Sequence, residues 1–367
     1  MNKESTVFDF MRFPLIVMII FIHCQGVEVN LQINHLELLD NIKFFFSGIL
    51  TPAAVPCFFF ISGFFCFYKY KSYHIDDYLK LLKRKAKTLV IPYFSWIFIA
   101  FLLSVMFNTA ISLEAGGALF DPLKKIQELG GWHMFWDYSK WGSDRTNWLG
   151  LSQMMTGPYV GPLWFLRDLI IMFMLSPIIY RFLNWSRQIG VILLFCCFIS
   201  GIWPNVPGLT ITTVTFFSLG AYFGITKESP IAIVEKCEYV NYIVTAILGF
   251  FYFKYSGRST EIGNVIYPFY VITLFISYMA LASRMSKKYQ MNKLLSSSSF
   301  FIYLIHTIIC IPVCKLVINK LIATNSFFIG LGKYFLYVLM VASLSFAIYV
   351  FIKKTSPKLL TALSGGR

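Results

Sequence analysis

The sequence predicts an all-α integral membrane protein, a bundle of about ten transmembrane helices with both termini in the cytoplasm. The chain of 367 residues is 57% hydrophobic and only 13% charged, whereas an average soluble domain is roughly 25% charged. Apolar segments long enough to cross a hydrocarbon core of about 30 Å recur along the whole chain. We therefore expect a single membrane domain over residues 1–367.

Ten apolar segments are the expected spans. In order, they lie near residues 9–27, 43–68, 88–108, 162–181, 188–203, 210–226, 239–254, 264–283, 299–317 and 330–352. With the N-terminus inside, most basic residues fall in the loops of one side: Lys69, Lys71, Lys80, Lys83, Arg84, Lys85, Lys87, Arg181, Arg187, Lys227, Lys236, Arg284, Lys287, Lys288, Lys293, Lys353, Lys354, Lys358 and Arg367. The positive-inside rule places that side in the cytoplasm.

The net charge of +15 is better explained by this topology and by anionic lipid headgroups than by nucleic acid, because the basic residues form short clusters and no continuous stripe. Glu4 and Asp9 precede the first apolar segment and no small-residue cleavage site follows it. We therefore expect this segment to remain in the protein as a helix.

The first span carries Arg12 and His23 within one apolar run. Eleven residues of α-helix place both side chains on one face, about 16 Å apart. Ionisable groups in a membrane helix usually face a protein interior or a cavity and serve a substrate or proton path. Arg12 alone could be a snorkelling anchor, and His23 a buried packing residue. Near the bilayer midplane, His23 is the best candidate for a general base.

The second span is interrupted by TPAAVP, residues 51–56. Two prolines so close together should break or kink a helix. Broken helices at membrane depth often line cavities, and a simple kink is the alternative.

Before the third span, Arg84 and Lys87 belong to a basic cluster, KLLKRKAK. Such a cluster suits a polyanion such as a nucleotide phosphate. The alternative is a solvated cluster that halts translocation of the chain across the membrane during insertion.

The segment of about residues 109–161 is expected to be extracytoplasmic and is rich in tryptophan. Its aromatic rings suit carbohydrate, since sugars stack on rings while their hydroxyls need polar partners; an interfacial aromatic belt is the alternative. The residues in question are Trp132, Trp136, Asp137, Tyr138, Trp141, Asp144, Arg145, Trp148, Tyr159 and the following Trp164.

Three further ionisable residues lie inside predicted spans. Arg167 and Asp168 open the fourth span, in GPLWFLRDL. They could be mutual partners or acceptor ligands. Because adjacent residues do not face each other on a helix, we expect each to have a separate partner. His306 lies within the ninth span and is a candidate for acceptor binding, proton relay or packing. Eight cysteines lie in or beside apolar spans, where we expect no disulfide and no metal site.

These motifs resemble the membrane-bound acyltransferase family 3, which includes O-acetyltransferases of polysaccharides and lipopolysaccharides. Its landmarks occur in the family's order: FDFMRFPLIVMIIFIH, VPCFFFISGFF, GPLWFLRDL, FFSLGAYFG and SFFIYLIH. The resemblance spans nearly the whole chain. It implies an acyl-coenzyme A donor, acetyl most often, and transfer to a glycan or lipid-linked hydroxyl at the inner membrane.

The resemblance also implies roles for single residues. His23 with Asp9 would be catalytic; Arg12, Arg84 and Lys87 would bind the donor; Trp164, Arg167, Asp168 and His306 would bind the acceptor. The family has two arginines spaced three apart where this chain has Arg84 and Lys87, so one forked contact is lost and donor choice is less certain. Direct transfer needs no covalent intermediate, and the sequence offers no obvious activated serine or cysteine nucleophile.

Two other functions fit parts of the pattern. A transporter or flippase for a polar or lipid-linked saccharide would also need a broken span and buried ionisable groups, but it predicts inverted repeats, which the sequence does not show. A non-catalytic partner in glycan assembly is the third possibility, against which Asp9, Arg12 and His23 argue. The sequence does not indicate the acceptor, the acyl chain, the oxyanion-stabilising groups or the oligomeric state.

Overall fold

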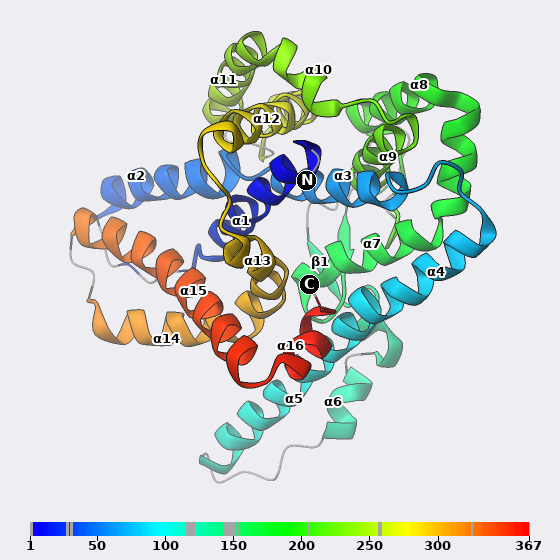
Figure 1. Ribbon diagram of the computed structural model, residues 1–367. Helices are drawn as coiled ribbons and strands as arrows, with labels where there is room; N and C mark the ends of the chain where they lie inside the picture. The colour runs from blue at the N-terminus through cyan, green and yellow to red at the C-terminus, as the bar shows by residue number, and fades with distance from the viewer. Residues whose placement is uncertain are drawn as a thin grey trace. The chain divides into compact units, whose positions relative to one another are not determined.

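The computed structural model describes residues 3–26, 29, 32–114, 122–128, 130–141, 152, 154–204, 206–255, 259–323 and 326–366. Across these residues the chain is built of helices with one small two-stranded ribbon (Figure 1). Among them, seven helical stretches are long and apolar enough to cross a membrane, and the shorter helix Ile211–Thr226 is also apolar. The prediction of an all-α membrane protein agrees with this; the ten spans and the cytoplasmic termini stay predictions.

The elements follow the predicted segments closely. They are α1 (Lys3–His23), α2 (Ile33–Phe44), η1 (Phe45–Ile49), α3 (Ala54–Phe67), α4 (Ile75–Lys85), η2 (Ala86–Val90), α5 (Ile91–Glu114), α6 (Pro122–Glu128), η3 (Gly131–Phe135), β1 (Ser139–Trp141), β2 (Met155–Gly157), η4 (Gly161–Leu163), α7 (Trp164–Met174), α8 (Ser176–Ser200), α9 (Ile211–Thr226), α10 (Pro230–Lys236), α11 (Glu238–Lys254), α12 (Glu261–Lys288), α13 (Lys293–Ile305), η6 (His306–Cys310), α14 (Ile311–Leu321), α15 (Phe327–Thr355) and α16 (Pro357–Ser364).

The chain packs as two compact units. Unit 1 comprises Met1–Lys71 and Phe216–Thr355, and unit 2 comprises Ser72–Thr215 and Ser356–Arg367. One boundary along the chain falls inside α9, whose first residues belong to unit 2 and whose remainder belongs to unit 1. Each unit has its own buried apolar residues.

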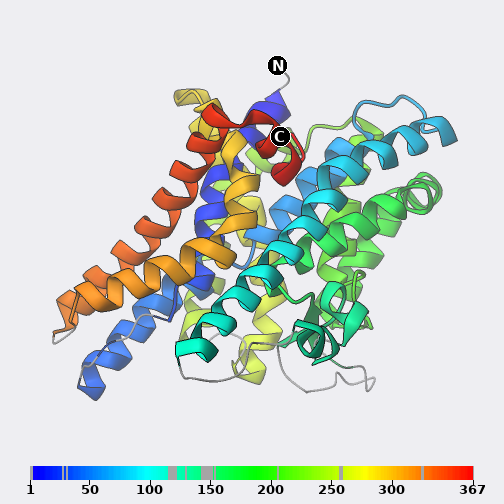
Figure 2. The same ribbon diagram turned by 90° about the horizontal axis from the view of Figure 1, so that it is seen from below.

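In unit 1, α1 packs against α3, α12, α13 and α15, and α11 pairs with α12. Figure 2 shows α14 beside α15, as the contacts between these two helices require. Phe8 of α1 makes edge-to-face contacts with Phe60 and Phe64 of α3, with ring centroids 5.8 and 5.2 Å apart. Such aromatic pairs stabilise the contact beyond simple burial. They hold the helix that carries Arg12 and His23 against its neighbours.

Glycines bring α3 and α9 into backbone contact. A Cβ added at Gly63 would lie 2.0 Å from the carbonyl oxygen of Phe217, and one added at Gly220 would lie 2.0 Å from that of Phe60. No side chain fits at these distances, so the two backbones can approach only at glycine. The motifs ISGFF and FFSLGAYFG therefore carry helix packing.

The predicted interruption of the second span is present. The helix that begins as α2 passes through η1 and ends at Ile49, and α3 starts at Ala54, with Pro56 in its first turn. Because a break leaves backbone carbonyls without helical partners, other groups must bind them. The hydroxyl of Tyr270 donates to the carbonyl of Ile49 at 2.8 Å, and that of Tyr278 donates to the carbonyl of Leu50.

Among the residues that the structure describes, three segments, η1, η2 and η6, are π-helical. Each inserts a wider turn into an otherwise continuous helix, and such turns are frequent at functional sites. The basic cluster before the third span includes η2, and His306 opens η6. Pro312 follows in the first turn of α14, and the chain changes direction between α13 and α14 (Figure 2).

Charged residues tie the start of α1 to two other helices of unit 1. The carboxylate of Glu235 accepts hydrogen bonds from Lys3 at 2.8 Å and from Ser283 at 2.6 Å, and Lys287 lies 2.9 Å away. Partial burial opposes ionisation of Glu235, but these donors outweigh it and lower its pKa to about 2. The carboxylate is therefore ionised at neutral pH and joins α1, α10 and α12.

In unit 2, the fourth predicted span, residues 162–181, covers α7 and the start of α8, and the fifth, residues 188–203, falls on the remainder of α8 and the residues after it. Between the two predicted segments, Arg187 has φ of 50° and interrupts α8, where the sequence analysis expected the chain to turn. α4 packs against α7, and α16 packs against α5. The indole N–H of Trp96 donates to the carbonyl of Leu363 at 2.9 Å, which fixes α16 on α5.

Candidate active site

Helix α1 carries the first group of candidate residues. It is helical from Lys3 to His23, so Arg12 and His23 belong to one helix, as predicted. Asp9 and Arg12 form an ion pair, with Nη1 to Oδ1 at 2.7 Å, and the Arg12 side chain keeps 37% exposure. Arg12 thus has donors left for an anionic ligand, since a guanidinium has five N–H groups.

His23 is the last residue of α1 and its side chain is half-buried. A half-buried ring at the end of a helix remains accessible to a substrate.

His306 contacts His23 from another helix. The ring centroids of the two residues lie 5.4 Å apart at an interplanar angle of 51°; α1 packs against α13, and His306 is the first residue after α13. The side chain of His306 is fully buried, whereas that of His23 is half-buried. The structure thus brings together two candidates that the sequence analysis treated separately.

One nitrogen of His306 is satisfied and the other is not. Nδ1 lies 2.7 Å from the carbonyl oxygen of Tyr303 and 3.2 Å from that of Ile302. Nε2 is buried and has no hydrogen-bond partner among the described residues. Buried polar atoms without partners are rare and call for an explanation.

Arg167 and Asp168 belong to unit 2, and they are mutual partners, one of the alternatives that the sequence leaves open. Nε and Nη2 of Arg167 donate to Oδ1 of Asp168 at 3.0 and 2.8 Å. The rule for adjacent helical positions concerns where side chains leave the helix; the long arginine side chain folds back far enough to reach its neighbour. Both side chains are buried, at 2% and 0% exposure.

Each residue of this pair also has the separate partners that were expected. Arg167 donates to the carbonyls of Trp136 and Thr156, the latter at 3.0 Å. Both belong to the tryptophan-rich segment of residues 109–161, which is called the outer segment after its predicted location. Oδ2 of Asp168 accepts from the hydroxyls of Thr210 and Thr213 at 3.2 and 3.1 Å. The pair therefore connects α7 to the outer segment and to α9. Its role in acceptor binding stays a prediction.

Several aromatic residues of the outer segment stack on one another. The ring centroids of Trp132 and Trp136 lie 5.7 Å apart, and those of Trp141 and Trp164 lie 6.4 Å apart. Trp132 remains 58% exposed, so this ring is available to a ligand. Asp144, Arg145 and Trp148 lie outside the described residues.

Arg84 and Lys87, the predicted donor-binding pair before the third span, are both exposed. Arg84 is in the last turn of α4 and Lys87 is in η2. The two residues belong to unit 2, whereas Arg12 and both histidines belong to unit 1. Their role as donor ligands stays a prediction.

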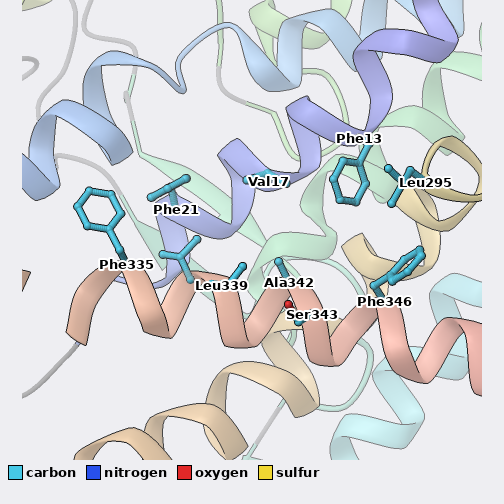
Figure 3. Close-up of a pocket in the computed structure, with 10 residues that line it drawn as sticks. Phe13, Val17, Phe21, Leu295, Phe335, Leu339, Ala342, Ser343 and Phe346 are labelled. Atoms are coloured by element: carbon cyan, nitrogen blue, oxygen red, sulfur yellow. The ribbon is translucent and has the colours of Figure 1, made fainter. Parts of the chain in front are cut away.

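An apolar groove of about 340 Å³ lies between α1, α13 and α15 of unit 1. Its lining is almost entirely hydrocarbon: Phe13, Val17, Phe21, Leu295, Phe335, Val338, Leu339, Ala342, Ser343 and Phe346 (Figure 3). A nucleotide or a sugar needs polar partners, which this groove does not supply. This groove is therefore not the candidate site for a nucleotide or a sugar.

Comparison with known proteins agrees with the resemblance inferred from the motifs. The chain matches the family described as Acyltransferase domain over residues 6–350, nearly its whole length, and it belongs to that family. It is also similar to the succinoglycan biosynthesis protein ExoH of Rhizobium meliloti (strain 1021), with 27% identity over 220 residues, 58% of this chain and 52% of that protein. The chain thus spans about half the length of this relative. No solved structure matches the chain significantly.

Proposed function

We propose that the protein is a membrane O-acyltransferase of the inner membrane that moves an acyl group, acetyl first among the candidates, from cytosolic acyl-coenzyme A to a hydroxyl of a glycan or lipid-linked sugar. One observation carries the proposal. A half-buried histidine ends the helix that also holds an accessible arginine, in a chain that belongs to an acyltransferase family.

The donor is assigned to Arg12. Its guanidinium is held by Asp9 and is partly exposed, so it can form charge-assisted hydrogen bonds to a phosphate. Arg12 and His23 lie eleven residues apart on one helix, which corresponds to about 16 Å along its axis. Coenzyme A is a long molecule with phosphates at one end and the thioester at the other, so it suits two groups separated in this way.

The base is assigned to His23. Neutral imidazole takes the proton of the acceptor hydroxyl as the oxygen attacks the thioester carbonyl. The C–S bond breaks, the new ester C–O bond forms, and the proton passes from imidazolium to the departing thiolate. No covalent enzyme intermediate is required. The proton that leaves the alcohol ends on the thiol of coenzyme A.

The acceptor class is supported by the relative. ExoH is described by its part in the biosynthesis of succinoglycan, which is a glycan. Sugar hydroxyls are also the groups that exposed aromatic rings help to position, and the outer segment exposes Trp132. A transporter of the same saccharide would transfer no acyl group at all.

The test uses the purified full chain in lipid nanodiscs with radiolabelled acetyl-coenzyme A and a glycan or lipid-linked sugar. His23→Ala should lower kcat by a factor on the order of 10² to 10⁴, the usual contribution of a general base. His35→Ala is the matched control, because His35 is an exposed histidine of α2 in the same unit. His23→Ala with a rate close to that of the wild type would contradict the assignment.

A further inference from the structure

The unsatisfied nitrogen of His306 is the strongest unexplained feature of unit 1. The side chain has no exposure to solvent, and Nε2 has no partner among the described residues. Leaving a buried polar group without a hydrogen-bond partner destabilises the folded protein. A group of this kind is retained where it has a partner during function.

The tautomer of His306 follows from its contacts. Both neighbours of Nδ1 are backbone carbonyls, of Tyr303 and Ile302, and a carbonyl can only accept a hydrogen bond. Nδ1 must therefore carry the proton. In the neutral ring, Nε2 is then a bare acceptor, so it needs an N–H or O–H donor.

We infer that His306 is the positioning residue of His23: its Nε2 accepts the ring N–H of His23 and so fixes which nitrogen of His23 faces the acceptor hydroxyl. This inference rests on the proposed function for its catalytic meaning, and the contact itself can be tested without activity. His306 is not the base, because its full burial keeps it away from a substrate while half-buried His23 lies beside it.

The geometry is close to that of a direct bond. Two imidazole rings joined by an N–H···N bond of about 2.9 Å have centroids roughly 5 Å apart. The observed centroid distance is 5.4 Å, so the two rings lie at about the separation that such a bond requires. The ring of His306 cannot rotate freely, because two carbonyls hold Nδ1.

The contact has two consequences for the proposed reaction. A neutral histidine that donates one N–H to His306 keeps its other nitrogen unprotonated, ready to accept a proton. Once His23 is protonated, the same hydrogen bond becomes charge-assisted and roughly twice as strong. His306 therefore stabilises the imidazolium that forms during transfer.

The position of His306 in η6 explains how the ring is held. It is the first residue of a π-helical turn that follows α13, and Tyr303 and Ile302 are the last turn of that helix. The backbone N–H of His306 donates to the carbonyl of Ile302, and Nδ1 lies against the same carbonyl and that of Tyr303, each of which has a second lone pair to offer. A backbone feature therefore orients the side chain.

Two substitutions test the roles of the two ring nitrogens of His306 separately. His306→Asn keeps a donor near the position of Nδ1 and removes the acceptor at the position of Nε2, whereas His306→Gln places an amide oxygen near Nε2. We expect His306→Asn to lower kcat by a factor on the order of 100 with KM unchanged, as for loss of tautomer control. His306→Gln should recover most of that loss.

The decisive measurement is ¹⁵N NMR of histidine-labelled protein in lipid, with the signals of His23 assigned through His23→Gln. In the wild type, His23 should show one tautomer and an N–N coupling across the hydrogen bond to His306; in His306→Asn it should show a mixture of tautomers. Absence of the coupling in the wild type, or equal loss of activity in His306→Asn and His306→Gln, would overturn the inference.

Failure of the proposed function gives a different result. If the wild type transfers no acyl group while the coupling and the tautomer change are present, the contact between His23 and His306 is supported and the proposed acyl transfer is refuted. If His23→Ala is inactive but His306→Asn is as active as the wild type with an unchanged His23 tautomer, the assignment of His23 as general base is supported. The positioning role of His306 is then refuted.

Discussion

At the residue scale, the sequence identifies ionisable groups in apolar spans but not their neighbours. His23 and Arg12 could be assigned to one helix because helical geometry relates residues on the same span. The contact between His23 and His306 could not, because it depends on how α1 and α13 pack. The pairing of Arg167 with Asp168 is only one of several alternatives in the sequence, since it depends on the conformation of one long side chain.

Arg12 should act in donor binding and not in the chemical step. Arg12→Gln should raise the KM for acetyl-coenzyme A about tenfold or more with little change in kcat, because it removes a charge-assisted hydrogen bond to phosphate. Arg12→Lys should have a smaller effect, since it retains the charge and loses the fork. Initial rates at varied donor concentration measure both quantities. Lys236→Gln removes an exposed charge of α10 and serves as control; an unchanged KM in Arg12→Gln would refute the role.

At the scale of elements, the apolar pattern predicts where helices lie, and their breaks are predicted where proline or a charged loop marks them. The break after Ile49 and the turn at Arg187 follow from such signals. The π-helical turns do not, because their extra residue is accommodated by contacts with other helices and leaves no local composition signal. Glycine motifs on α3 and α9 were read as family landmarks, and the structure assigns them to backbone packing.

The contact of α7 with the outer segment should depend on Arg167. Arg167→Ala leaves Asp168 buried with only hydroxyl donors, and breaking a buried pair in this way costs about 3–5 kcal/mol. The double variant Arg167→Leu with Asp168→Leu should lose less, because no unpaired charge remains. Thermal unfolding in detergent compares the two. A double variant that is less stable than Arg167→Ala would be the opposite result.

At the scale of the whole molecule, the orientation of the spans is the main prediction that the structure does not test. It depends on the positive-inside rule, which counts Lys and Arg in short loops. The structure defines helices and two compact units, but a helix can cross a membrane in either direction. The distribution of Lys and Arg between the loops on the two sides selects the direction in which each helix crosses.

Reporter fusions test this orientation. Alkaline phosphatase, which is active only outside the cytoplasm, should be inactive when fused after Lys71 and active when fused after Ser139, because the basic loop containing Lys71 is predicted inside and the outer segment outside. A cytoplasmic fluorescent reporter at the same two positions is the control and should give the reverse pattern. Activity of the phosphatase after Lys71 would invert the proposed topology.

The three π-helical turns change how mutational scans of this protein should be interpreted. A turn that holds an additional residue advances every following side chain by about 100° relative to an uninterrupted α-helix. A helical wheel drawn straight through residues 86–90 or 306–310 would assign buried positions to the lipid-facing side and lipid-facing positions to the interior. Two wheels, one for each side of the widened turn, are needed to relate tolerance of substitution to environment.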